Sequence, residues 1–343
     1  MGVLVTGSKG YIGSVLVDYL TERSPKVIGL DSGLFETSRL EPCPKDSLTI
    51  QKDIRHVVPE DLAGVSTVIH LAALSNDPLG ALRPELTSEI NHFGAIQLAQ
   101  AAKEAGVKRF IFLSTQSIYG ISDPDGPELD EERSEKTPLT AYAKTKFLAE
   151  QDIQRLHSDD FFVVVLRPAT VFGYSPRLRT DIVFNNLVAQ AHFKGEINLT
   201  SDGRPWRPVI HVKDLCLAIS QAAELPKSQI ASRVYNVGVE GGNYTVLQLA
   251  QRATELVPGS RLTFSSEATP DERSYRVSFA RIYHELAFRP VWTLPMGGRE
   301  LIDKWDELGC TAEQILGPRT IRLAHLEERQ RLGSLDEKLY PRT

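Results

Sequence analysis

Short apolar runs alternate with helical patterns through the first half of the chain. Six runs are rich in β-branched residues and end at turn residues, which is typical of strands. They span residues 2–6, 26–30, 47–51, 67–72, 109–114 and 161–167. Helical periodicity is found at residues 11–22, 84–105 and 140–157. Because the runs are apolar on both faces, the pattern predicts an α/β fold, a doubly wound parallel sheet with helices on both sides.

The pattern changes after about residue 170, where proline and glycine interrupt it. Further helices are expected near residues 180–192, 211–224, 245–256 and 297–308. We expect residues 1–170 to form the nucleotide-binding domain, with later segments returning to it. Residues 171–310 would mainly form a smaller C-terminal substrate-binding subdomain, over the carboxyl ends of the strands.

The last part of the chain, residues 311–343, is a charged C-terminal extension. Its stretch RLAHLEERQRLG is predicted to be helical. Two interpretations stay open for this helix, a solvated surface helix and a contact between subunits.

Charge and composition exclude several classes of partner. The net charge of −5 over 343 residues gives no basic field for nucleic acid, and no apolar run reaches the length of a membrane span. The first strand begins at once, which leaves no room for a signal peptide, so a cytoplasmic protein is expected. The three cysteines, Cys43, Cys216 and Cys310, are far apart. They are expected to be reduced thiols, with no metal site.

A glycine loop follows the first strand in VTGSKGYIGSVLVDYL. Gly7, Gly10 and Gly13 supply what a pyrophosphate needs there: a tight turn, close approach of backbone N–H groups, and close packing of helix on strand. The spacing G-x-x-G-x-x-G differs from the commoner G-x-G-x-x-G, but its place between strand and helix favours a Rossmann-type dinucleotide site.

Two carboxylates refine the choice of dinucleotide. Asp31 ends the second strand, where a carboxylate accepts hydrogen bonds from the adenosine ribose and repels a 2′-phosphate, so NAD is favoured over NADP. Lys9 adds a positive charge to the loop and leaves NADP open. Asp53, followed by Ile54, comes after the third strand, where its carboxylate could accept from the adenine amino group.

Hydroxyl groups cluster at the end of the fifth strand, in FLSTQSIYG. Downstream, TAYAKTKFLAE places Tyr142 and Lys146 four apart, hence on one helix face. A lysine ammonium beside a phenol favours the phenolate, so we expect the pKa of Tyr142 to fall from about 10 toward neutrality. Such a tyrosine serves as a general acid or base.

With these features, the chain resembles the extended short-chain dehydrogenase/reductase family, in particular its NAD-dependent nucleotide-sugar epimerase/dehydratase group. The resemblance covers about residues 1–305. The matching stretches are TGSKGYIG, Asp31, KDI, HLAAL, INHFGA, STQSIYG, YAKTK, LRPATVFG and RPVIHVKDL. It implies that Thr115, Tyr142 and Lys146 are catalytic and that Lys146 also binds the nicotinamide ribose.

The glycine loop and the resemblance together give the expected NAD-binding set. It comprises Gly7, Gly10, Tyr11, Ile12, Gly13, Asp31, Asp53, Ile54, Leu71, Ala72, Ala73, Asn91, Tyr142, Lys146, Pro168 and Ala169. The expected substrate-binding set comprises Ser75, Gln116, Ser117, Asn186, Arg207 and Arg273, in which the two arginines would hold the diphosphate of a nucleotide sugar. Asp77 would disfavour an acidic sugar unless Arg83 offsets its charge.

The residues between Thr115 and the tyrosine-glycine turn narrow the chemistry. Relatives that eliminate water, remove a carboxyl group or epimerise at C3 and C5 carry an acid, a base or a cysteine in this stretch. Gln116 and Ser117 do not ionise near neutral pH. Hydride transfer with a single phenol remains, which means epimerisation at C4 or reduction and oxidation at a keto group.

Three functions therefore stay open. The first is an NAD-dependent epimerase of a nucleotide sugar, and the second is an NAD(P)-dependent reductase or dehydrogenase of a nucleotide-linked keto sugar or related carbonyl compound. The third is a non-catalytic NAD-binding sensor or scaffold. A homodimer is expected through the helices that begin near residues 84 and 140, with no nucleic acid and no membrane as partner.

Overall fold

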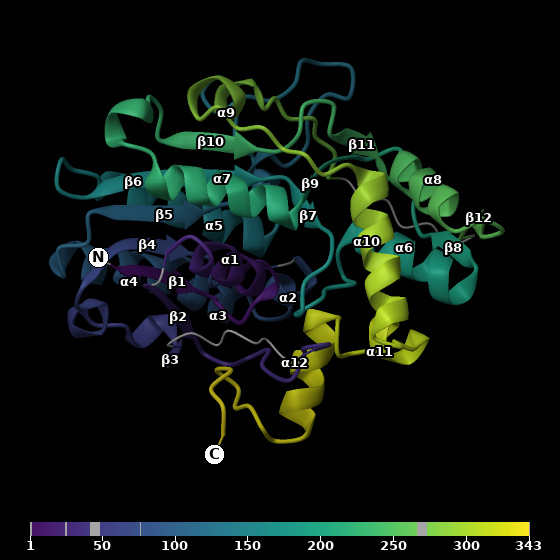
Figure 1. The fold of residues 1–343 in the computed structure, drawn as a ribbon, viewed down its shortest axis with the longest axis horizontal. Coiled ribbons are helices and arrows are strands. Elements are labelled where there is room, and N and C mark those ends of the chain that lie inside the picture. The colour runs from purple at the N-terminus through teal and green to yellow at the C-terminus, as the bar shows by residue number, and fades with distance from the viewer. Residues whose placement is uncertain (1, 25, 42–48, 76, 266–272, 343) are drawn as a thin grey trace.

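A seven-stranded parallel sheet forms the centre of the protein (Figure 1). The computed structural model describes residues 2–24, 26–41, 49–75, 77–265 and 273–342. Strand order is β10-β6-β5-β4-β1-β2-β3. The strands are β1 (Gly2–Thr6), β2 (Val27–Asp31), β3 (Thr49–Gln51), β4 (Val65–His70), β5 (Arg109–Leu113), β6 (Phe162–Pro168) and β10 (Val234–Val237). The expected fold class, α/β with a Rossmann-type sheet, is confirmed.

Six of the seven strands were predicted, and β10 was missed. The pairing of β10 with β6 returns a late part of the chain to the sheet. Residues 47 and 48 of the third predicted strand lie outside the described residues.

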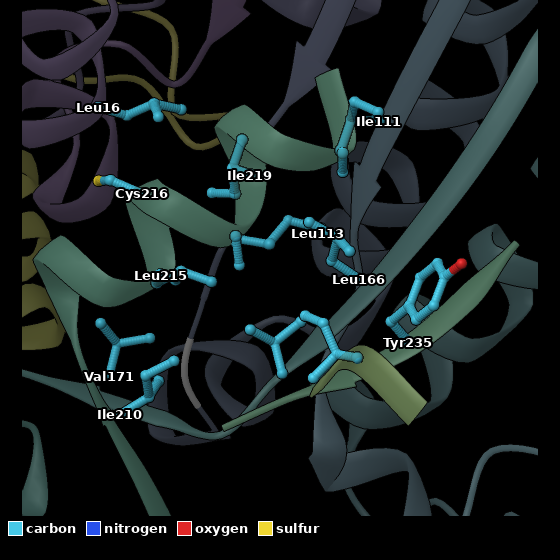
Figure 2. Packing of buried hydrophobic residues seen from close by; sticks show 14 of the residues in the cluster. Leu16, Ile111, Leu113, Leu166, Val171, Ile210, Leu215, Cys216, Ile219 and Tyr235 are labelled. Atoms are coloured by element: carbon cyan, nitrogen blue, oxygen red, sulfur yellow. The ribbon is translucent and has the colours of Figure 1, made fainter. Parts of the chain in front are cut away.

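Helices cover both faces of the sheet. On one face, α1 (Tyr11–Thr21) and α7 (Val212–Glu224) pack on the side chains of Val5, Ile69 and Ile111. Figure 2 shows Leu215 and Ile219 of α7 beside Ile111, Leu113 and Leu166 of the strands. The alternate residues of the same strands, such as Leu4 and Val68, face α4 (Ala95–Glu104) and α5 (Ala141–Arg155). Apolar residues at successive positions therefore serve two cores, which is why these strands do not alternate with polar residues.

The predicted helix at residues 84–105 is divided into three parts. They are α3 (Pro84–Ser88), a π-helical turn (Glu89–Gly94) and α4. A short helix that was not predicted, α2 (Asp77–Leu82), precedes them.

A smaller unit lies beyond the carboxyl ends of the strands, around a core that contains Phe184, Leu249 and Trp305 (Figure 1). Its helices are α6 (Val183–Lys194), α8 (Val246–Leu256) and α10 (Leu294–Glu307). Its strands are β7 (Thr170–Phe172), β8 (Glu196–Leu199), β9 (Trp206–His211), β11 (Asn243–Thr245) and β12 (Arg261–Phe264). They form a three-stranded sheet, β11-β9-β7, and a two-stranded sheet, β12-β8. The short helices α9 (Ala280–Glu285) and α11 (Ala312–Leu316) complete the late part of the chain.

The C-terminal extension packs against the loop that follows β2 (Figure 1). The helix predicted there is α12 (Arg322–Arg331). It is not a wholly solvated helix, because Arg322, His325 and Leu326 on one of its faces are buried. Arg329, in its last turn, donates to the carbonyl oxygens of Gly33 and Leu34 at 3.1 and 2.7 Å. Sequence alone did not predict this attachment.

Two further observations concern the described part of the chain. No helix there is long and apolar enough to cross a membrane. Cys216, which is buried, and Cys310 are free thiols, and Cys43 lies outside the described residues.

Candidate active site

A cavity of about 810 Å³ lies over the carboxyl ends of the sheet strands, between the sheet and the smaller unit. Most of the expected site residues line it. They are Gly7, Gly10, Tyr11, Ile12, Gly13, Asp31, Asp53, Ile54, Leu71, Ala72, Ala73, Ser75, Thr115, Ser117, Tyr142, Lys146, Pro168, Ala169, Arg207 and Arg273. The fold thus brings together residues at the ends of six strands of the sheet with residues of α5, of β9 and of the loop before α9.

The glycine loop has the geometry that a dinucleotide requires. Gly7 has φ +68°, and the N–H of Gly10 donates to the Gly7 carbonyl at 2.9 Å, which closes the turn. A Cβ at Gly13 would stand 2.0 Å from the same carbonyl oxygen, so only glycine lets the helix start so near the strand. The cap residue of α1 is Gly10, which has no side chain to bond the first N–H groups of the helix. Its first N–H groups are therefore available to the pyrophosphate of NAD, and the residues fit this cofactor.

Asp31 stands at the end of β2 with both carboxylate oxygens held by backbone. The N–H groups of Lys9 and Gly33 donate to it at 2.9 and 2.8 Å, and burial raises its pKa. The ammonium of Lys9 forms an ion pair with Glu36 at 2.9 Å. Lys9 is thus held by an acid, and the Asp31 carboxylate lines the cavity, which favours NAD over NADP.

Asp53 lines the cavity but is engaged by a neighbour. Its carboxylate accepts from the backbone N–H and the Nε of Arg55, both at 2.9 Å, and from Nη2 at 2.7 Å. Asp53 also caps the short helical turn Ile54–His56. The acceptor expected for the adenine amino group therefore already holds a guanidinium.

Thr115, Tyr142 and Lys146 meet where β5 ends and α5 begins. Thr115 accepts from the backbone N–H of Ser117 at 3.1 Å and hydrogen-bonds the phenol of Tyr142. Lys146 is one turn further along α5 and is 2% exposed, with its ammonium 4.1 Å from the ring centroid of Phe112. The three residues that the resemblance implied to be catalytic therefore lie together in one place.

The pKa of Tyr142 does not move in the expected direction. Burial raises it to about 12, although the hydrogen bond from Thr115 opposes the change. Burial also lowers the pKa of Lys146 to about 7, against the attraction of Glu150. A lysine that is easily deprotonated supplies little of the positive charge that would favour a phenolate. The expected fall in the pKa of Tyr142 is therefore wrong for the cavity without bound cofactor. Proximity of Lys146 does not reveal the cost of burying the phenolate and the ammonium.

A buried polar network that was not predicted from the sequence lies beside Lys146 and favours the charged form of its ammonium. Glu150, one turn after Lys146, accepts from the hydroxyl of Ser114 at 2.6 Å and from the Nε of Arg167 at 3.2 Å. All of these partners are less than 4% exposed. The spacing of four between Lys146 and Glu150 was visible in the sequence, but only the fold shows that both are buried.

Three expected site residues are not among the residues that line the cavity. Asn91 accepts from the N–H of Leu74 at 2.8 Å and donates to its carbonyl at 3.0 Å. Gln116 donates to the carbonyl of Arg167 at 2.9 Å, and Asn186 to that of Thr180 at 2.9 Å. The amides of Asn91 and Asn186 hold loops in place, and that of Gln116 bonds the end of β6, so these three residues position the wall of the site.

The neighbour of Asn186 contacts two residues that line the cavity, Tyr11 and Arg179. Asn185 is fully buried, accepts from the N–H of Gly173 at 3.0 Å and donates to the Arg179 carbonyl at 2.9 Å. The adjacent asparagines in IVFNNL look alike in sequence, and only the helix phase of α6 separates them.

Cations gather on the side of the cavity formed by the smaller unit. Arg207, on β9, donates to the carbonyl of Trp206 at 2.8 Å and to that of Arg273. Arg273 forms an ion pair with Asp77. Arg83, which was expected to offset Asp77, instead donates to the carbonyl of Glu337 in the C-terminal extension. Arg273 therefore has the role that we expected for Arg83.

Two buried arginines that line the cavity, Arg179 and Arg322, were not predicted. Arg179 donates to the hydroxyl of Ser75 at 2.9 Å and pairs with Asp181 at 2.8 Å. Its charge acts on Tyr142 and lowers the pKa of that phenol, against the effect of burial. Nothing in its local sequence distinguished it from a surface arginine.

The fold and the site together define a Rossmann-type enzyme class that binds a dinucleotide and carries a tyrosine–lysine pair. Residues 3–238 match the NAD dependent epimerase/dehydratase family. The chain therefore belongs to this family, whose cofactor is NAD.

Individual relatives agree with that assignment. UDP-glucose 4-epimerase of Mus musculus is 31% identical over 296 residues, which cover 76% of this chain and 84% of the relative. UDP-glucuronic acid decarboxylase 1 of Arabidopsis thaliana is 28% identical over 310 residues, covering 86% and 67% of the two chains. Among solved structures, MoeE5 in complex with UDP-glucose and NAD is 29% identical, with a TM-score of 0.76, and the match covers 90% of this chain and 99% of that one.

Proposed function

We propose that the protein catalyses the NAD-dependent epimerisation, at C4, of a nucleotide-activated sugar through a transient 4-keto intermediate. The observation that carries this proposal is the composition of the wall around Tyr142. Thr115 and Lys146 stand beside the phenol, while the turn after Thr115 contributes only Ser117, a residue that does not ionise near neutral pH. Such a turn offers no acid or base of its own for elimination, so the phenol is left to move one proton at a hydroxyl group.

The chain's own residues would act on the C4 hydroxyl as follows. Tyr142 takes the hydroxyl proton and later returns it, and Thr115 donates a hydrogen bond to the same oxygen. NAD held by the glycine loop, Asp31 and Lys146 would supply the acceptor, and then the donor, of a hydride at C4. Lys146 binds the nicotinamide ribose and, when protonated, lowers the cost of the phenolate. The exchange leaves NAD unchanged overall.

Loss of the proton from Tyr142 needs help from the ligands, since burial raises the pKa of this phenol to about 12. The positively charged nicotinamide ring, placed beside Pro168 and Ala169, would favour a nearby phenolate by simple attraction. A protonated Lys146 adds to this effect.

A UDP-sugar is the substrate class that we propose. The MoeE5 complex contains UDP-glucose, and two of the relatives described above are named for UDP-sugars. Arg207 and Arg273 would hold the diphosphate, and Ser75 and Ser117 would contact the sugar. The ion pair of Asp77 with Arg273 leaves less negative charge at the sugar than the sequence suggested.

The proposal is tested by incubating the purified protein with UDP-glucose, UDP-galactose, UDP-N-acetylglucosamine and UDP-glucuronate, without added cofactor. NMR would follow the sugar, and absorbance would follow reduced cofactor. A new C4 epimer without net formation of NADH is the expected result. Turnover that requires added NAD(P)H and stops when it is consumed would establish the reductase instead. Binding without turnover across the panel would favour a sensor or scaffold.

We also propose a homodimer through the α5 face. Phe93, in the π-helical turn, is 60% exposed, and Leu148 on α5 is 44% exposed. The two segments contact each other, so these side chains belong to one side of the molecule. Large apolar side chains exposed near each other favour burial between subunits.

A further inference from the structure

The C-terminal extension contributes a buried cation to the wall of the cofactor cavity. Arg322, the first residue of α12, lines the cavity and is 3% exposed. Its backbone N–H donates to Asp181 at 3.3 Å. Nη1 donates to the hydroxyl of Ser38 at 2.6 Å, and Nη2 donates to the carbonyl of Arg177 at 3.0 Å. The side-chain partners of this guanidinium are thus neutral oxygen atoms.

The surroundings of Arg322 hold more buried positive than negative charge. Arg177 and Arg179 are 1% and 7% exposed and lie close enough to lower the pKa of Arg322, whose burial is the larger cause. Asp181 is the carboxylate paired with Arg179, and Asp31 acts on Arg322 from the other side. In the described part of the structure, the Nε of Arg177 is buried without an acceptor. A buried cation with neutral partners costs free energy, so this arrangement favours an anionic ligand.

The position of the cluster identifies which part of NAD is near. Arg322 interacts electrostatically with Asp31, the acceptor for the adenosine ribose. Its neighbour Arg179 interacts with Tyr11, in the first turn after the glycine loop, and with Tyr142. The cluster therefore extends from the adenosine ribose to the catalytic tyrosine. In a dinucleotide that lies along the glycine loop, the diphosphate occupies this interval.

We propose that Arg322 is a cofactor-binding residue that contacts the diphosphate of NAD from the side opposite the glycine loop, so that the C-terminal extension closes the cofactor site. The family match ends at residue 238 and includes no part of this extension. The proposal depends on NAD as the cofactor and holds whichever sugar is the substrate.

The extension is attached on two sides of the adenosine end. Arg329 donates to the carbonyls of Gly33 and Leu34 in the loop after β2. Near the end of the extension, the hydroxyl of Tyr340 lies 2.9 Å from the Nε2 of His56. The guanidinium carbon of Arg55 lies 4.2 Å from the centroid of the Tyr340 ring. NAD bound beneath these contacts can leave only after the extension moves. Slow release suits an enzyme that reuses one NAD in every turnover.

Binding of ADP and of adenosine to the cofactor-free full chain distinguishes a diphosphate contact from a general packing role. Calorimetry would compare the wild type with Arg322→Met and Arg322→Lys. Arg331→Met is the matched control, since Arg331 is exposed on the same helix. A charge-assisted hydrogen bond predicts that Arg322→Met raises the Kd of ADP about ten- to a hundredfold, with partial recovery in Arg322→Lys. The Kd of adenosine should change less than twofold, and the control should match the wild type.

Equal losses for ADP and adenosine would overturn the proposal, because they would show a pocket that is merely misshapen. Unchanged ADP affinity would overturn it as well. A third result would also contradict the proposal. If the wild type bound NADP more tightly than NAD and Arg322→Met lost this preference, Arg322 would be assigned to a 2′-phosphate.

A second variant tests closure at a residue that does not itself line the cavity. Arg329→Met removes the attachment to Gly33 and Leu34 and should speed the release of NADH, followed by its fluorescence in stopped flow, at least tenfold. The same variant should lose NAD during purification, as measured by chromatography of the acid extract. Release at the wild-type rate would show that the extension does not retain the cofactor, which contradicts closure.

Discussion

Asp77, at the start of α2, forms an ion pair with Arg273, which comes from the loop before α9 almost two hundred residues later. Both side chains line the cavity, and Asp77 also accepts from the hydroxyl of Thr140, the cap of α5, at 2.5 Å. One carboxylate thus connects the catalytic helix with the arginine expected to bind a diphosphate. A substrate that uses Arg273 must share or replace this pairing.

Asp77→Asn should therefore tighten the binding of UDP. The amide keeps an oxygen for Thr140 and removes the negative charge that competes for Arg273. A partly exposed ion pair is worth up to about 1 kcal/mol, so the Kd of UDP should fall about two- to fivefold. Titration calorimetry measures the Kd of UDP for each variant. Arg273→Ala, which removes the cation, should raise this Kd about tenfold or more. A higher Kd in Asp77→Asn would show that the carboxylate itself serves the ligand.

Tyr142→Phe should abolish most turnover while the cofactor site stays intact. Loss of a general acid or base typically costs about a hundred- to ten-thousandfold in rate. The ring still fills its place on α5, so the retained NAD should equal that of the wild type. Tyr283→Phe is the control, because Tyr283 is not among the cavity-lining residues of the described structure. Wild-type turnover in Tyr142→Phe would remove the phenol from the mechanism.

The sequence predicted the sheet well because its signals were local. Residues 110–113 are apolar at every position, and the glycine loop joins strand and helix within a dozen residues. Tyr142 and Lys146 share a helix face, so their spacing alone brought them together. Strand β10 is only four residues long, and its place in the sheet depends on a partner about seventy residues earlier. Short segments with distant partners carry little local signal.

The site residues that the sequence missed depend on burial and on distant contacts. Arg179 meets Ser75, and Arg322 meets Asp181, only in the folded chain, and arginines in loops or at helix starts are commonly exposed. The prediction of a lowered pKa for Tyr142 was wrong for the same reason. Proximity of Lys146 was visible, but the cost of burying its ammonium was not.

Lys146 should make the stability of the NAD-free protein increase with pH. Its pKa is about 7 in the folded state against an ordinary 10.5, so between these values the unfolded chain binds more protons. The free energy of unfolding therefore rises with pH across that window, by at most about 1.4 kcal/mol per pH unit from this one group. Below pH 7 the contribution of Lys146 does not change with pH. Denaturant unfolding between pH 7 and 10 would measure the slope. Lys146→Met should reduce it, while Lys144→Met, at an exposed position on the same helix, should not. Equal slopes in all three proteins would mean that Lys146 keeps its charge when buried.

Phe93→Glu should convert the expected dimer into a monomer. Phe93 and Leu148 are among the large apolar side chains that remain exposed, at 60% and 44%. They lie on two segments that contact each other, the π-helical turn and α5. A carboxylate buried between two subunits, facing its own symmetry mate, would be strongly unfavourable. Leu332→Glu is the matched control, because Leu332 is 67% exposed on the extension, away from α5. Light scattering should give twice the mass of one chain for the wild type and the control, and a single mass for Phe93→Glu. A dimer that survives in Phe93→Glu would place the subunit contact elsewhere, and a monomeric wild type would leave these two side chains without a partner subunit to cover them.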